Sequence, residues 1–324
     1  MATLIKSNKW YVRESESERE ISPSAHQRSP FPFPPTHLPT HSFSFGGFQY
    51  KFEHQSAAAS CRMTFSVFLP SVALASTAVP VLYYLSGLTC TDDNVVQKSG
   101  IQQYAERYNV AVVCPDTSPR GLGYPTEDDS YDFGTGAGFY VDATTEPWKR
   151  GYRMDTYVTK ELPEVLAATE VLASALDLSR SSIMGHSMGG HGALVLALRN
   201  PGKYARCSAF APICRPSAVG WGQKAFKGYL GEADVDAWQR YDACGLVEGY
   251  TGDTVEVLVD TGLADEFLES QLRVDDLVEA ARGNERVVVT SRMHEGYDHS
   301  YFTIATFVEE HVKWHADKLH GESQ

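Results

Sequence analysis

Short apolar runs of strand length recur along the chain from about residue 46. Two of them, Pro80–Leu85 and Val110–Cys114, are apolar at nearly every position, which is typical of strands buried on both faces of a sheet. An earlier run, Thr64–Leu69, has the alternating pattern of a half-buried strand. We expect four further strands in the second half of the chain: Ser182–Met184, Cys207–Phe210, Val255–Val259 and Arg286–Val289.

Segments with the apolar spacing of helices lie between these runs. Glu161–Leu176, Gly192–Leu198 and Phe302–Lys318 are each predicted to be helical or to begin a helix. His311 and His315 are four residues apart on the last of these, but no third metal ligand is evident, so we expect a solvated helix face there. The alternation predicts an α/β fold, with a mostly parallel central sheet flanked by helices and an antiparallel N-terminal edge.

Residues 1–44 differ in composition from the rest of the chain. Ser29–Ser44 is rich in proline, serine and histidine, and proline removes the backbone donors that helices and sheets need. We therefore predict a disordered or poorly ordered extension over residues 1–44 and one folded domain over residues 45–324. Within that domain, residues 115–153 are glycine-rich and aromatic, which indicates a long ordered loop of the kind that builds sites.

Charge and composition exclude several classes of function. The formal net charge of -13 would repel a polyanion, so nucleic acid is not an expected partner. No apolar stretch approaches the roughly 20 residues that a membrane span needs. The N-terminus has no apolar region of a secretory signal, and the six scattered cysteines favour free thiols, so we expect a cytoplasmic protein.

The motif Gly185-His186-Ser187-Met188-Gly189 matches the pattern G-x-S-x-G. It follows a predicted strand and precedes a predicted helix, which is the context that a nucleophilic serine requires. A sharp strand-to-helix turn lifts the serine out of the sheet, and glycines on both sides avoid a steric clash. Ser187 is therefore the predicted nucleophile of an α/β-hydrolase fold.

A serine hydroxyl needs a base, and the fold supplies its partners in the order Ser, acid, His. Two aspartates follow the strand Val255–Val259: Asp260 lies nearest the sheet and Asp265 lies farther along the loop, which favours Asp265. Two histidines follow the last strand, and they are His294 and His299. From position alone, neither alternative is removed.

An oxyanion hole needs two backbone N–H donors. One is expected from Met188, directly after the nucleophile, and the other from the loop after an early strand. The segment Leu85-Ser-Gly-Leu-Thr-Cys90 fits this loop, with Leu88 as the donor.

Together these residues resemble one family, the S-formylglutathione hydrolases, also called esterase D. The resemblance covers the chain from about residue 46 to residue 318. It is carried by Leu85–Cys90, Pro115-Asp-Thr-Ser-Pro-Arg-Gly121, Asp132–Ala143, Gly185-His-Ser-Met-Gly-Gly-His-Gly-Ala193, Phe210–Cys214 and Glu295-Gly-Tyr-Asp-His-Ser-Tyr301.

The resemblance implies a triad of Ser187, Asp265 and His299 and the hydrolysis of S-formylglutathione to glutathione and formate, in formaldehyde detoxification. It implies no metal and no organic cofactor, and it implies a cytoplasmic homodimer. Tyr84 stands where the family often has tryptophan, which affects only the expected shape of the pocket.

Four residues are candidates for the pocket around the nucleophile. Trp148 and Trp221 are large enough to form the walls of a tight acyl pocket, although such residues often belong to the core. His186 flanks Ser187 and is expected to shape the pocket, and Cys90 is expected to border it.

Two other functions are compatible with part of this pattern. A general short-chain carboxylesterase would use the same triad on a different natural substrate. A non-catalytic binding protein on a hydrolase scaffold would keep the fold but would not need an intact Ser, Asp and His set.

Overall fold

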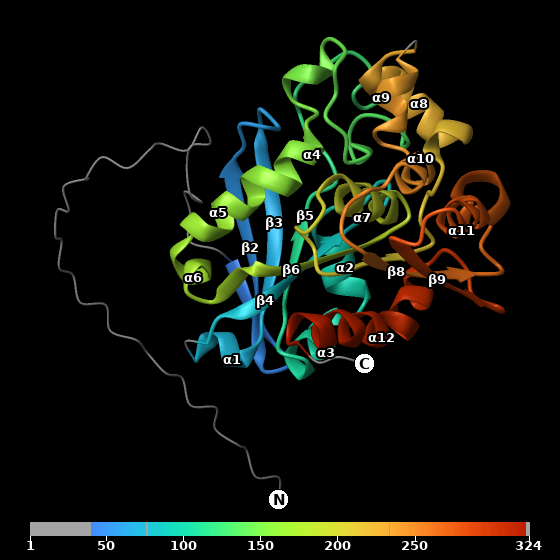
Figure 1. The fold of residues 1–324 in the computed structure, drawn as a ribbon. Coiled ribbons are helices and arrows are strands. Elements are labelled where there is room, and N and C mark those ends of the chain that lie inside the picture. The colour runs from blue at the N-terminus through green and yellow to red at the C-terminus, as the bar shows by residue number, and fades with distance from the viewer. Residues whose placement is uncertain (1–39, 76, 233, 322–324) are drawn as a thin grey trace, which may run out of the picture. The chain divides into compact units, whose positions relative to one another are not determined.

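The structure is a computed structural model that describes residues 40–75, 77–232 and 234–321 of the 324-residue chain. The strands of the described part form one nine-stranded sheet with the order β1-β2-β3-β5-β4-β6-β7-β8-β9 (Figure 1). Their bounds are β1 Thr40–Ser44, β2 Gly47–Gln55, β3 Arg62–Leu69, β4 Val79–Leu85, β5 Ala111–Pro115, β6 Leu176–His186, β7 Cys207–Phe210, β8 Val255–Gly262 and β9 Val287–His294.

The first strands form an antiparallel edge and the rest of the sheet is parallel. The pairs β1–β2, β2–β3 and β3–β5 are antiparallel, and each pair from β5–β4 to β8–β9 is parallel. This confirms the predicted fold class. Because β4, β6, β7, β8 and β9 run parallel, their carboxyl ends lie on one side of the sheet, where ligands of such sheets bind.

Strand β1 lies within the segment for which a disordered extension was predicted. Residues 40–44 pair with β2, and Phe43 meets Phe48 with ring centroids 5.4 Å apart. Aromatic pairs across neighbouring strands stabilise such an edge in spite of its polar composition. Residues 1–39 lie outside the described residues, so the extension stays a prediction for them.

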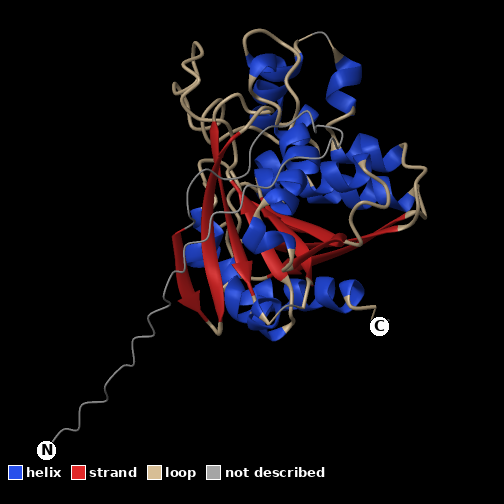
Figure 2. Ribbon diagram, turned by 90° about the vertical axis from the view of Figure 1, so that its left-hand side faces the viewer, coloured by secondary structure: helices blue, strands red, loops and turns tan. Residues whose placement is uncertain are grey.

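Helices cover both faces of the sheet, as Figure 2 shows. The predicted helix over 161–176 is interrupted at Thr169, where the backbone is extended with ψ 113°. The helical segments of the described part are α1 Ser71–Leu74, α2 Asp93–Lys98, α3 Ile101–Arg107, η1 Trp148–Arg150, α4 Met154–Thr156, η2 Tyr157–Glu161, α5 Leu162–Ala168, α6 Glu170–Ala173, α7 Met188–Arg199, η3 Pro216–Ala218, α8 Gly220–Leu230, α9 Val235–Gln239, α10 Ala243–Glu248, η4 Leu268–Leu272, α11 Val274–Arg282 and α12 Tyr301–Leu319.

The sequence of β4 is apolar throughout because the strand lies between two hydrophobic cores. Val81 and Tyr83 point into the larger core, beneath α5, α7 and α11, whereas Leu82 and Tyr84 point into the core beneath α2, α3 and α12. All four side chains are buried. A strand that contributes to two cores has no polar face, and it therefore loses the alternating pattern.

The histidines of α12 are buried, so the predicted solvated face is wrong. His311 and His315 are both 0% exposed. His311 Nδ1 and His315 Nε2 each lie 2.8 Å from the Oγ atom of Ser208 on β7. The helix turns this polar stripe toward the sheet because a buried serine and the buried carboxylate of Asp260 provide partners there.

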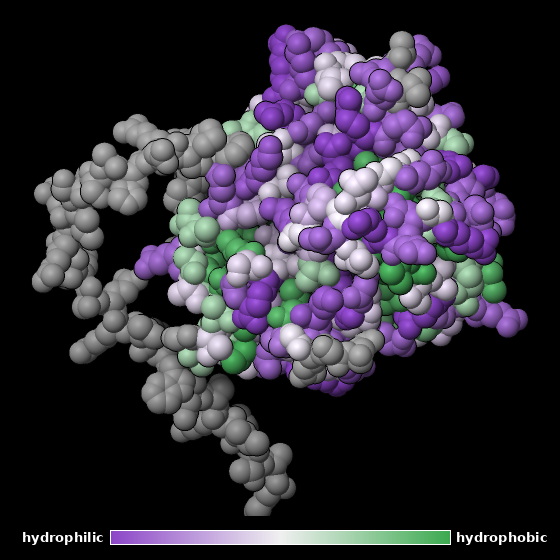
Figure 3. Space-filling view, viewed as in Figure 1, coloured by the Kyte–Doolittle hydropathy of each residue, from purple (hydrophilic) through white to green (hydrophobic). Residues whose placement is uncertain are grey.

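On the face in Figure 3, hydrophilic residues predominate and hydrophobic residues form separate patches. None of the helices described has both the length and the apolar composition to cross a bilayer. All six cysteines are free thiols, as expected, and five of them are buried.

The fold is expected to become less stable as the pH is lowered, because it contains buried neutral histidines such as His191. Burial lowers the pKa of His191 to about 4, while its Nε2 donates to the carbonyl of Phe139 at 3.0 Å. In the unfolded chain the His191 imidazole has a pKa near 6.5, so the unfolded chain binds the proton first as the pH falls. The contribution of neutral His191 to stability is therefore fully present above about pH 6.5 and is lost progressively towards pH 4. His191 alone should cost about 2 kcal/mol between pH 7 and pH 5.

Urea unfolding at the two pH values measures this loss, and His191→Gln is the matched variant because its amide can still donate to Phe139. We expect the variant to show a pH-dependent loss that is smaller by about 2 kcal/mol. An equal loss in both proteins would show that His191 does not titrate in this way.

Candidate active site

Ser187 occupies the turn between β6 and α7, with φ 57° and ψ -118°. A positive φ is strained for a residue with a side chain and is common where function requires it. A Cβ atom on Gly185 would lie 2.2 Å from the carbonyl oxygen of Gly189, and one on Gly189 would lie 2.0 Å from that of Leu85. Both glycines of the motif are therefore needed to bring the turn this close to β4.

The backbone of this turn is fixed by the end of β7. The Ser187 N–H donates to the carbonyl of Phe210 at 2.9 Å. The Ser187 carbonyl accepts from the N–H groups of His191 at 2.9 Å and Ile213 at 3.3 Å. These bonds hold the strained residue in one orientation at the carboxyl end of the sheet.

Asp265 and His299 form a direct pair. His299 Nδ1 donates to Asp265 Oδ2 at 2.5 Å, and the Phe267 N–H donates to the other carboxylate oxygen at 2.8 Å. The Asp265 side chain is fully buried, and that of His299 is 16% exposed. This arrangement fixes the imidazole with Nδ1 protonated, which leaves Nε2 as the proton acceptor.

The loops that carry this pair are joined to each other. Ala264 N–H donates to the carbonyl of Tyr297 at 2.9 Å. A Cβ atom on Gly262 would lie 2.0 Å from that same carbonyl oxygen. The loop after β8 can approach the loop after β9 so closely because residue 262 is glycine.

The alternative residues Asp260 and His294 lie together in a different cluster. Asp260 is 0% exposed and accepts from Arg292 Nε at 2.6 Å and Arg292 Nη2 at 2.5 Å. His294 Nε2 and His311 Nε2 lie 3.3 Å and 3.2 Å from its Oδ2. Although burial opposes ionisation, hydrogen bonds from His311 and Arg292 hold the pKa of Asp260 well below its ordinary value. The structure thus pairs Asp260 with His294 and Asp265 with His299.

His186 connects His299 to the nucleophile turn. The two rings have centroids 4.6 Å apart, and His186 directly precedes Ser187. Burial, together with the neighbouring His299, keeps the pKa of His186 well below its usual range, so its ring is neutral. Phe267 packs on His299 from another side, with centroids 5.0 Å apart.

The loop after β4 lies against Ser187. A Cβ atom on Gly87 would lie 3.1 Å from the Ser187 Cβ atom, so glycine permits this approach. Leu88 follows and is half-buried. Neither the Leu88 N–H nor the Met188 N–H, at the start of α7, has an intramolecular acceptor within the described residues. Both are therefore free to bind an oxyanion.

The candidate pocket residues differ in their distance from the triad. Trp221 packs on Phe267 with centroids 4.7 Å apart, so it lies next to a neighbour of His299. Trp148 instead belongs to an aromatic cluster, in which its ring lies 4.7 Å from Phe133 and 4.7 Å from Tyr152. Within the described residues, none of the ring contacts of Trp148 is with Ser187, Asp265 or His299. Its burial has the ordinary explanation of aromatic packing.

Two aromatic residues at the site were not singled out from the sequence. One is Phe267, and the other is Tyr301, whose ring lies 5.9 Å from that of His186. Each stands two residues after a member of the Asp265 and His299 pair, and this proximity along the chain was the available signal.

Comparisons with known proteins identify the family of the chain. A family model described as "Putative esterase" matches residues 56–317. An S-formylglutathione hydrolase from Mus musculus is 52% identical over 277 residues, which are 86% of this chain and 96% of the mouse protein. One from Arabidopsis thaliana is 49% identical over 275 residues, which are 85% of this chain and 95% of the plant protein.

A solved structure of an S-formylglutathione hydrolase also has the same fold as this chain. An S-formylglutathione hydrolase from Agrobacterium tumefaciens has a TM-score of 0.82 to this structure at 49% sequence identity, with 86% of this chain and 98% of that chain covered. The resemblance found in the sequence is therefore confirmed, and the chain belongs to the S-formylglutathione hydrolase family of esterases.

Proposed function

We propose that this protein hydrolyses S-formylglutathione to glutathione and formate, with Ser187 as nucleophile, His299 as base and Asp265 as its partner. The observation that carries the proposal is the 2.5 Å hydrogen bond between His299 and Asp265, beside a strained serine turn. Relatives that are 49–52% identical over almost their whole length bear the name of this activity.

The reaction begins as Ser187 Oγ attacks the formyl carbon and His299 Nε2 takes the hydroxyl proton. The tetrahedral intermediate collapses, the C–S bond breaks, and His299 returns the proton to the glutathione sulfur. Water, deprotonated by His299, then attacks the formyl-serine. The bond from the formyl carbon to Ser187 Oγ breaks, His299 returns the proton to Oγ, and formic acid leaves and ionises to formate. Asp265 stays ionised and stabilises the imidazolium in both steps.

The Leu88 and Met188 N–H groups hold the oxyanion in both tetrahedral intermediates. Donors of this kind are worth about 3 kcal/mol each because they are already oriented before charge develops. Trp221 and the neutral His186 limit the space around the acyl carbon. A tight pocket suits formyl, the smallest acyl group.

The natural substrate is tested by comparing S-formylglutathione with 4-nitrophenyl acetate. We expect a much larger kcat/KM for the thioester. Cleavage of the aryl ester without a preference for S-formylglutathione would replace the named substrate with that of a general short-chain carboxylesterase. Failure with both substrates, together with no fluorophosphonate labelling, would favour the non-catalytic alternative.

The resemblance to the S-formylglutathione hydrolases also supports a proposal about the assembly and the location. We propose a homodimer in the cytoplasm, acting in the removal of formaldehyde as its glutathione adduct. Sedimentation equilibrium of the full chain decides the oligomeric state, and a monomer at micromolar concentration would contradict the dimer.

Cys90 is expected to border the site, two residues after Leu88. Burial raises the pKa of its thiol, so little thiolate is present at neutral pH and alkylation should be slow. We expect iodoacetamide to lower the activity slowly in the wild type and hardly at all in Cys90→Ala. Cys61→Ala is the control, because Cys61 is more exposed. If Cys90→Ala were as sensitive as the wild type, Cys90 would not border the site.

A further inference from the structure

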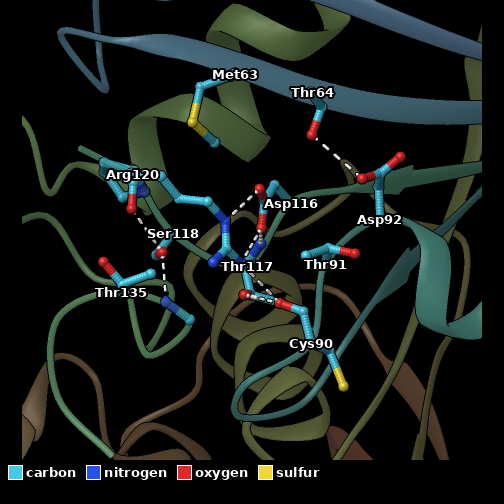
Figure 4. Close-up of polar contacts among 12 residues, drawn as sticks. Met63, Thr64, Cys90, Thr91, Asp92, Asp116, Thr117, Ser118, Arg120 and Thr135 are labelled. Atoms are coloured by element: carbon cyan, nitrogen blue, oxygen red, sulfur yellow. Dashed lines mark hydrogen bonds and ion pairs between the residues drawn. The ribbon is translucent and has the colours of Figure 1, made fainter. Parts of the chain in front are cut away.

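The segment Pro115–Gly121 has no role in the chemistry described above. It nevertheless contacts Cys90, at the end of the loop after β4 that carries the Leu88 N–H. The Cys90 carbonyl accepts two hydrogen bonds from it, from Thr117 Oγ1 at 2.5 Å and from Arg120 Nη2 at 3.0 Å (Figure 4). Both acceptor positions of this carbonyl are thus occupied. The residue at the end of the loop is held from behind by two side chains.

Arg120 is itself fixed by a two-point contact with Asp116. Its Nε donates to Asp116 Oδ2 and its Nη2 donates to Oδ1, each at 2.8 Å (Figure 4). Asp116 is 5% exposed, and its N–H donates to the carbonyl of Thr64 on β3 at 3.1 Å. A bidentate guanidinium–carboxylate pair has little rotational freedom, so the Cys90 carbonyl is held against the sheet.

A second connection reaches the same loop from Ser118. The Thr89 N–H donates to the Gly136 carbonyl at 2.9 Å, and the Gly136 N–H donates to Ser118 Oγ at 2.7 Å. Thr89 has φ 65°, a left-handed conformation that is uncommon for threonine. Such a conformation persists only where the surroundings fix it. The two residues after Leu88 are therefore held by one segment.

We propose that Arg120, fixed by Asp116, is a positioning residue for the oxyanion hole. It holds the Cys90 carbonyl and thereby fixes the orientation of the Leu88 N–H, without contacting the reacting atoms. The inference rests on the role proposed for the Ser187 site. Loss of one oxyanion donor typically lowers kcat by about 100–1,000-fold, so a displaced donor should cost part of that.

The test uses Arg120→Leu and Arg120→Lys, with kcat and KM measured on S-formylglutathione and on 4-nitrophenyl acetate. We expect Arg120→Leu to lower kcat on both substrates by about 10–100-fold. KM should change by less than about threefold, because the donor stabilises the transition state rather than the ground state. Arg120→Lys keeps the positive charge but loses the two-point contact of the guanidinium, so its kcat should lie between those of the wild type and Arg120→Leu.

Arg199→Leu is the matched control. Arg199 Nη2 lies 3.1 Å from the carboxylate of Asp155, which is 8% exposed, and Arg199 Nη1 donates to the Arg240 carbonyl at 2.8 Å. Like Arg120, it thus contacts a buried carboxylate and a backbone carbonyl, but it lies at the C-terminal end of α7, and Ser187 caps the N-terminal end. We expect Arg199→Leu to lower Tm about as much as Arg120→Leu and to leave kcat unchanged.

Affinity for a boronic acid, which forms a tetrahedral adduct with the nucleophile, supplies a second readout. It should fall in Arg120→Leu by the same factor as kcat/KM. If kcat per fluorophosphonate-titrated site fell no more in Arg120→Leu than in Arg199→Leu, the proposal would be overturned.

Thr117→Val removes the other donor to Cys90 with little change in volume, and it decides the question if Arg120→Leu does not fold. A fall in kcat at unchanged KM supports the positioning role, and unchanged kcat overturns it. Wild-type enzyme that cleaves the aryl ester but not S-formylglutathione would refute only the proposed substrate, because the aryl ester still measures the oxyanion hole.

Discussion

Ser187→Ala is expected to abolish turnover of S-formylglutathione, with kcat falling by a factor of about a million. Without Oγ, no acyl-enzyme can form, and His299 and the oxyanion donors retain only the small rate enhancement of an oriented water. The loss of activity should appear as a lower kcat, and KM should be almost unchanged. Labelling with a fluorophosphonate, which requires the activated hydroxyl, should disappear at the same time.

Ser182→Ala is the matched control for this prediction. Like Ser187, Ser182 is a buried serine, but it lies within β6, and its Oγ accepts from the Arg206 N–H at 3.2 Å. Removing it should lower stability by about 1 kcal/mol and leave kcat within a few-fold. Retention of more than a tenth of the activity in Ser187→Ala would show that another group is the nucleophile.

The central strands β4 and β5 could be predicted from the sequence because they are buried on both faces, which makes their apolar runs continuous. The G-x-S-x-G turn between a strand and a helix then placed Ser187 at the end of a later strand, β6. The order of the strands then confined the acid and the base to the loops after β8 and β9. What remained was a choice between two aspartates and two histidines.

That choice could not be made from the residues alone, because it depends on contacts between distant segments. Asp260 is held by Arg292 on β9 and by His311 on α12. Nothing in the local pattern around either partner indicates this cluster. Position along the loop favoured Asp265, and the family resemblance favoured both Asp265 and His299. In the structure these two residues form a direct hydrogen-bonded pair.

The buried histidines of α12 are a second case in which contacts with a distant segment could not be predicted from the local pattern. A helical pattern assigns polar residues to solvent, so His311 and His315 were expected to be exposed. Their partner Ser208 lies more than a hundred residues away, within a strand that is otherwise apolar. Strand β1 is a further case, because its contacts with β2 outweigh the composition of residues 40–44.

Asp265→Asn should lower kcat by about ten-thousand-fold while the fold stays intact. An asparagine amide can accept at its oxygen or donate at its nitrogen, and a donated hydrogen bond would force the proton of His299 onto Nε2. The imidazole then cannot accept the Ser187 proton, and the imidazolium loses its stabilising charge. Activity should be measured with S-formylglutathione, and Tm should be followed in parallel.

Asp260→Asn separates catalytic loss from structural loss, because it makes the same chemical change at a buried carboxylate on the same strand–loop segment. Here the expected effect is on stability, since Arg292 loses its buried counter-charge, and breaking such a pair costs about 3 kcal/mol or more. The folded fraction should retain kcat within about tenfold, counted per fluorophosphonate-labelled site. If Asp260→Asn lost more kcat than Asp265→Asn, the acid of the triad would be Asp260. The opposite order would show that Asp265 orients the base, in the pair that lies farther from the sheet, where the loops after β8 and β9 meet.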